Sequence, residues 1–98
     1  MADNEIPSCP PPDPNPARPK LVAPRGVIDC HAHVFGPESK YPYSPARGYT
    51  PPDASLETYL AVLDVLAIER AVLTQPSVYG TDNSAMLDAM ARHPGRIL

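Results

Sequence analysis

The chain has 98 residues and a formal net charge of −3, with 8 Lys and Arg against 11 Asp and Glu. This length holds at most one small domain, and the low basic content excludes an electrostatic footprint for nucleic acid or an anionic membrane. The first residues carry acids and no apolar core, and the longest apolar run, 60–68, is far too short to span a bilayer, so we expect neither a signal peptide nor a membrane helix. Two cysteines, Cys9 and Cys30, make a poor disulfide framework, which favours a reducing, cytoplasmic location.

Residues 1–24 form a proline-rich arm. They hold eight of the 15 prolines and few apolar residues. Proline removes a backbone donor and favours extended, solvated chain. We therefore predict a disordered or loosely draped arm over 1–24 and a folded part over 25–98.

A short apolar run at 27–30 predicts a buried strand, and His31 and His33 follow at its end. Residues two apart in a strand point to the same side, so both imidazoles can aim at one point where the strand meets a loop. Convergent imidazoles can bind a metal ion or polarise a carbonyl oxygen. The alternative is a pair of histidines at a half-exposed strand end without chemistry. In a regular strand Cys30 points the opposite way, and we expect it to pack against a helix.

An irregular loop is expected over 35–54, because Gly and Pro recur throughout it. Its four aromatic residues argue against disorder and favour a packed, functional loop. A helix should follow Ser55, which is a good N-cap. Its apolar residues recur on one helical face, and they are Leu56, Tyr59, Leu60, Leu63, Leu66 and Ala67.

The segment 70–75 predicts a second strand, and a second helix should begin near Asp82 or Asn83, which are both good caps. That helix should end at His93, and 96–98 reads as the opening of a third strand. Alternating strands and helices imply a parallel sheet with right-handed crossovers. Because the chain ends inside a strand, we expect it to be a fragment of a larger α/β protein.

Polar residues gather at the carboxyl ends of the first two predicted strands, where parallel α/β folds place their chemistry. The histidine pair ends the first strand. The second strand is followed by Gln75, Ser77, Tyr79 and Asp82. The long aromatic loop leaves from the same rim, so the topology predicts one site there.

Three motifs resemble a known family. D-C-H-A-H-V-F-G-P (29–37) resembles the first metal-binding strand motif of the amidohydrolase superfamily, whose fold is a (β/α)8 TIM barrel. Y-P-Y-S-P-A-R-G-Y (41–49) and Q-P-S-V-Y-G-T-D-N-S (75–84) resemble its branch of pyrone-dicarboxylate, sugar-lactone and muconolactone hydrolases. The likeness covers 24–98. It implies an α/β chain that forms the N-terminal part, about two and a half βα units, of such a barrel.

The resemblance also implies site residues. His31 and His33 match the pair that binds a divalent, zinc-like metal in most members. In the lactonase branch the pair is thought to polarise the lactone carbonyl without a tightly bound metal. Tyr49 and Ser77 match substrate-binding positions, whereas Tyr79 replaces a smaller polar residue and would fill pocket volume, which puts a dicarboxylate substrate in doubt.

The implied activity is hydrolysis of a lactone of a carboxylated small molecule by attack of water. The family's catalytic Asp and its further His and Arg residues belong to later strands, so we expect the 98-residue chain to be incomplete and inactive. Arg47 could reach an anionic substrate or be a solvated loop residue. Two alternatives stay open: a zinc-dependent decarboxylase of the same superfamily, and a non-catalytic module that binds a partner through its arm. The oligomeric state is open too.

Overall fold

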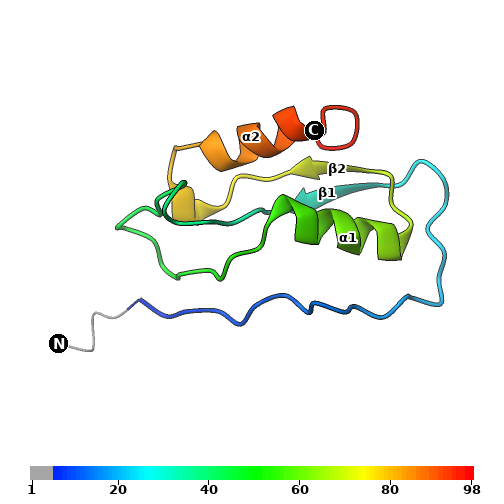
Figure 1. Cartoon of the computed structure of the whole chain (residues 1–98), viewed down its shortest axis with the longest axis horizontal. Coiled ribbons are helices and arrows are strands. Elements are labelled where there is room, and N and C mark those ends of the chain that lie inside the picture. The colour runs from blue at the N-terminus through cyan, green and yellow to red at the C-terminus, as the bar shows by residue number, and fades with distance from the viewer. Residues whose placement is uncertain (1–5) are drawn as a thin grey trace.

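The computed structural model describes residues 6–98 as a parallel sheet with helices packed against it (Figure 1). The chain order is β1 (Ile28–Ala32), α1 (Leu56–Leu66), β2 (Arg70–Leu73), a 3-10 turn (Ser77–Tyr79) and α2 (Ser84–Arg92). β1 and β2 pair in parallel. The α/β class and the alternation of strands and helices are therefore confirmed, and the 3-10 turn is a feature that the sequence did not predict.

In the described residues, the predicted third strand appears only as an isolated bridge beside β2 in a two-stranded sheet. Ile97 forms a parallel bridge with Ala71, the residue that also pairs with Asp29 of β1. The Ala71 N–H donates to the Arg96 carbonyl at 2.9 Å, and the Leu98 N–H donates to the Ala71 carbonyl at 2.8 Å. β2 therefore lies between β1 and the chain end, so the spatial order of the strands follows the sequence order, as a barrel requires.

Both helices begin where polar caps were predicted. The Ser55 hydroxyl accepts the N–H of Thr58 at 3.2 Å, which caps α1. At α2 the backbone cap position is Asn83, but the capping carboxylate is that of Asp82, which accepts the Ser84 N–H at 3.0 Å. Hydrogen bonds from the Ser84 hydroxyl and N–H hold the pKa of Asp82 below its usual value.

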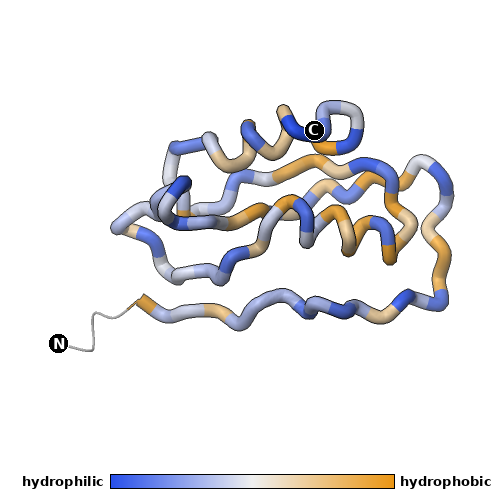
Figure 2. The backbone as a smooth tube through the Cα atoms, viewed as in Figure 1, coloured by the Kyte–Doolittle hydropathy of each residue, from blue (hydrophilic) through white to orange (hydrophobic). Residues whose placement is uncertain are grey.

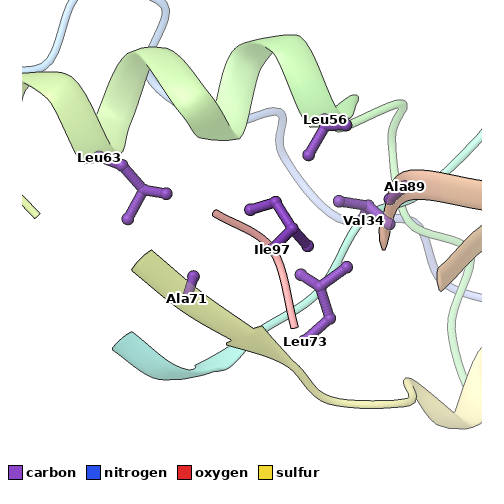
Figure 3. Close-up of a cluster of buried hydrophobic side chains, with 7 residues drawn as sticks. All are labelled: Val34, Leu56, Leu63, Ala71, Leu73, Ala89 and Ile97. Atoms are coloured by element: carbon purple, nitrogen blue, oxygen red, sulfur yellow. The ribbon is translucent and has the colours of Figure 1, made fainter. Parts of the chain in front are cut away.

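One face of the sheet carries the main core. Ala71 and Leu73 of β2 are buried, whereas Arg70 and Val72, which alternate with them, are exposed, so the strand alternates between two environments. Leu56 and Leu63 extend from α1 toward β2, with Ile97 between the layers (Figure 3). Ala89 of α2 belongs to the same cluster, so both helices cover this one face. Apolar residues accordingly concentrate on the strands and on α1 (Figure 2).

The described part of the arm, 6–24, runs extended beside α1 (Figure 1). Arm prolines between 11 and 16 line a cavity of about 360 Å³ together with Thr58, Ala61 and Val62 of α1. Residues 1–5 of the predicted arm lie outside the described residues, and its disorder stays a prediction. Within 6–98 no helix combines the length and apolarity needed to cross a membrane.

Leu63→Ala tests the core. Leu63 is 0% exposed, and its truncation should lower the free energy of unfolding by about 2–5 kcal/mol, because the cavity left behind adds to the lost burial. Leu87 of α2 is 54% exposed, so Leu87→Ala should change it by less than about 0.5 kcal/mol. Denaturant unfolding of both variants measures the difference. Equal losses would contradict the assigned core.

Candidate functional site

The end of β1 carries an extra residue relative to β2. Asp29 pairs with Ala71 and Ala32 with Leu73, so three steps on β1 match two on β2. Such a bulge shifts the alternation of side chains. The expectation that Cys30 packs against a helix is wrong for this reason: Cys30 is exposed, and Ala32 packs against the core instead.

The two histidines lie side by side at this strand end. Their ring centroids are 5.4 Å apart and their ring planes are nearly perpendicular, at 89°. His31 is exposed and His33 is half-buried. The predicted proximity of the two imidazoles is therefore present in the structure.

A backbone carbonyl beyond β2 orients His33. The His33 Nδ1 lies 2.8 Å from the Thr74 carbonyl oxygen. A carbonyl only accepts, so Nδ1 must donate its proton, and neutral His33 keeps its lone pair at Nε2. The Thr74 N–H in turn donates to the Ala32 carbonyl at 2.9 Å, which extends the β1–β2 pairing to the histidine. Sequence reasoning missed Thr74, because a carbonyl contact over 41 residues leaves no side-chain signal.

Asp29 is a second residue that sequence reasoning missed. One carboxylate oxygen accepts the backbone N–H of His31 at 3.1 Å, and the other accepts the Tyr59 hydroxyl at 2.5 Å. Burial, together with this hydrogen bond, raises the pKa of Tyr59. Asp29 therefore ties the backbone of the histidine motif to helix α1. The D-x-H spacing is the only trace that it leaves in the sequence.

A cavity of about 410 Å³ opens beside His33. Tyr49 lines it with His33, so the structure brings these two predicted site residues together. Phe35 adds an aromatic wall, with its ring centroid 5.8 Å from that of His33. Arm residues from Cys9 to Pro12 line the cavity as well. No residue pattern in the arm indicates this contact with the cavity.

The other predicted site residues lie outside this cavity lining. Ser77 is exposed at the start of the 3-10 turn. The Arg47 guanidinium donates from Nε to the Thr50 hydroxyl at 3.0 Å and from Nη1 to the Ser44 carbonyl at 3.0 Å. It also lies 5.7 Å from the centre of the Tyr43 ring. Arg47 thus braces its own loop, and its contact with a substrate stays a prediction.

Tyr79 is 4% exposed and belongs to a second cluster with Tyr43, Val78 and Ala85. Its hydroxyl accepts the Gly36 N–H at 2.7 Å, which anchors the loop that follows the histidine motif. The Tyr43 and Tyr79 ring centroids are 5.2 Å apart. Burial raises the pKa of Tyr79. Burial and the neighbouring Tyr79 raise the pKa of Tyr43 to about 12. A contact between Tyr79 and substrate stays a prediction.

Two imidazoles fit part of a divalent-metal site. A zinc site takes three or four protein ligands, and each ligating His donates its second ring N–H to an acceptor, as His33 does to Thr74. Within residues 6–98, however, no group of three or more His, Cys, Asp or Glu could hold a metal ion. Among residues 6–98 the histidine pair could therefore supply two ligands, and the rest would have to come from elsewhere.

Tyr59→Phe tests the tie at Asp29. The change leaves a half-buried carboxylate without its O–H donor, and we expect a loss of about 1–2 kcal/mol in the free energy of unfolding. Tyr41→Phe is the matched control, since the Tyr41 hydroxyl donates to the exposed Asp88 carboxylate at 2.6 Å. Tyr41→Phe should lower the free energy of unfolding by less than Tyr59→Phe does, as measured by denaturant unfolding. The reverse order would contradict the role given to Asp29.

Alkaline pH tests the tyrosine contacts. The hydrogen bond to Asp88 and burial raise the pKa of Tyr41 to about 12, and burial raises that of Tyr43 to about 12, from an ordinary 10. A tyrosine whose pKa is higher in the folded than in the unfolded protein contributes its full stabilisation at pH values below the unfolded pKa. This contribution to the free energy of unfolding should therefore fall as the pH rises from 10 to about 12. Unfolding midpoints across this range, with Tyr43→Phe as a less pH-sensitive reference, measure it. A flat profile would contradict the assigned contacts.

The chain is similar to known amidohydrolases in sequence. The amidohydrolase family model matches residues 28–98. A 4-sulfomuconolactone hydrolase of Rhizobium radiobacter is 46% identical over 93 residues, which is 95% of this chain and 31% of the relative. Another, of Hydrogenophaga intermedia, is 51% identical over 86% of this chain and 27% of the relative. A 2-pyrone-4,6-dicarboxylate hydrolase of Comamonas testosteroni is 43% identical over 84% of this chain and 27% of the relative.

Solved structures agree with these matches. A probable 2-pyrone-4,6-dicarboxylic acid hydrolase of Acinetobacter baumannii, crystallised with citric acid, superposes with a TM-score of 0.66 at 37% identity. The match covers 71% of this chain and 26% of that one. An apo structure from Agrobacterium tumefaciens gives a TM-score of 0.71 at 29% identity, over 81% of this chain and 29% of that one. The chain thus spans less than a third of the proteins it matches, as part of an α/β barrel. Because the family model covers most of its length, the chain belongs to the amidohydrolase family.

Proposed function

We propose that the protein to which this chain belongs opens a lactone of a carboxylated small molecule. Water adds to the ring carbonyl, the ring C–O bond breaks, and the products are a carboxylate and a hydroxyl group. The names of three relatives, sulfomuconolactone and pyrone-dicarboxylate hydrolases, support this reaction. The full activity would require polypeptide beyond the part of the barrel described here.

The observation that carries the proposal is the hydrogen bond from His33 Nδ1 to the Thr74 carbonyl. It leaves an electron pair at Nε2, on a residue that lines the cavity. Such a nitrogen can ligate a cation or accept a proton from water. It can donate to a lactone oxygen only when the ring is protonated. The two chemistries expected of the pair therefore require different protonation states of His33.

His31 and His33 are the residues that would hold a divalent metal. When bound, such an ion would polarise the lactone carbonyl and stabilise the developing oxyanion. A metal-independent reaction would instead rely on imidazolium donors at the same place. We propose the metal-binding role as the one that the free Nε2 of neutral His33 suits best.

The substrate contacts are proposals as well. The Tyr49 phenol lines the cavity beside His33 and is suited to hold the substrate there. The exposed Ser77 hydroxyl lies after β2, on the rim where β1 also ends. Arg47 and Tyr79 would act from the loop and from the second cluster. A cytoplasmic location remains an expectation.

Histidine substitutions in the full-length protein test the function. Purified protein should hydrolyse a muconolactone or pyrone-carboxylate lactone, and His33→Ala should lower kcat by about 10²-fold or more. His31→Ala should lower it as well. Release of acid, followed by a pH indicator, measures the rate, and metal analysis of each variant measures whether zinc content falls with the same residues.

His93→Gln is the matched control, because this third histidine is exposed at the C-terminal end of α2. It should leave kcat and metal content unchanged. Lactone hydrolysis that survives both His31→Ala and His33→Ala at the wild-type rate would refute the proposed role of the pair.

A further inference from the structure

The arm is attached to the loop that carries Tyr49. Ser8 forms a parallel bridge with Thr50. The Thr50 N–H donates to the Pro7 carbonyl at 2.7 Å, and the Cys9 N–H donates to the Thr50 carbonyl at 3.3 Å. These bonds fix the arm one residue away from a predicted substrate-binding tyrosine. Arg47 holds the same Thr50 through its hydroxyl, so the loop is braced at the point where the arm joins it.

Beyond this bridge the arm forms one side of the cavity at His33. Cys9 and Pro10–12 line it from the arm, and His33 and Tyr49 line it from the folded part. Among the residues that the structure describes, 6–98, no Asp, Glu, Lys or Arg lines the cavity. The lining residues with polar side chains are His33, Tyr49 and Cys9, whereas Pro10, Pro11 and Pro12 of the arm contribute rigid, apolar pyrrolidine rings without backbone N–H donors.

We propose that residues 9–12 are the apolar wall of the substrate cavity, against which the non-reacting face of the lactone ring packs. The inference rests on the proposed function. A wall of proline rings discriminates by shape and excludes charge, because an unpaired carboxylate against it would lose its hydration. The anionic groups of the substrate must therefore point away from the arm.

One relative aligns with most of the arm. The 4-sulfomuconolactone hydrolase of Rhizobium radiobacter matches 93 residues of this chain, which takes in most of residues 1–24. The arm is thus aligned with that relative, whereas the family model begins at residue 28.

Two bulky substitutions in the arm test the wall. In the full-length protein, Cys9→Phe should raise KM for the lactone about tenfold with little change in kcat, because the ring occupies cavity space. Cys9→Ser, which keeps the size, should leave KM within about twofold. Asn15→Phe is the matched control, since Asn15 is exposed in the same arm. An unchanged KM for Cys9→Phe would refute the proposal that residues 9–12 form the cavity wall. An equal rise in KM for Cys9→Phe and Asn15→Phe would refute it too.

A second measurement separates this inference from the proposed function. Amide hydrogen exchange at Thr50 should be slow in the full chain and faster after deletion of residues 1–12, because its acceptor, the Pro7 carbonyl, is then lost. If deletion of residues 1–12 leaves the exchange rate of the Thr50 amide unchanged, the placement of the arm on the loop is wrong. A wild-type protein that hydrolyses no lactone but shows the slow Thr50 amide refutes the proposed function, while the arm's position on the loop stands.

Discussion

The parallel pairing of β1 with β2 is the constraint on which the site depends. Regular pairing ends at Ala32 and Leu73, and two further hydrogen bonds at Thr74 extend it: its N–H binds the Ala32 carbonyl, and its own carbonyl binds His33. A single residue after β2 thereby fixes the backbone and the ring at the end of β1. Sheet geometry thereby sets which ring nitrogen of neutral His33 carries the proton.

Residues of β1 make two different kinds of contact, one with helix α1 and one at the cavity. The bulge between Asp29 and Ala32 lets Asp29 reach Tyr59 on α1 while His31 and His33 stay together at the cavity end of the strand. The helices cover one face of the sheet and contribute burial. Loop and arm gather at the carboxyl end of β1, where the cavity lies. Burial and the proposed chemistry are thus separated along one short strand, as is typical of α/β barrels.

Local signals predicted much of the fold, because caps, helical periodicity and H-x-H spacing are properties of neighbouring residues. Ser55 caps α1 as expected, and Ile97, in the predicted third strand, forms an isolated parallel bridge with β2. The bulge was not predictable, because it arises from pairing with a distant strand, and the expectation for Cys30 failed with it. The contacts of Thr74 and of the arm were missed for the same reason: they involve backbone groups far apart in the sequence.

The protonation of His33 tests the central claim most directly. Heteronuclear NMR of the imidazole nitrogens at neutral to mildly alkaline pH reports which nitrogen carries the proton. A proton held on Nδ1, with an unprotonated Nε2, is the predicted result, because the Thr74 carbonyl accepts only from Nδ1. A ring protonated at Nε2 alone would contradict the account, since His33 would then lack the free nitrogen that the site requires.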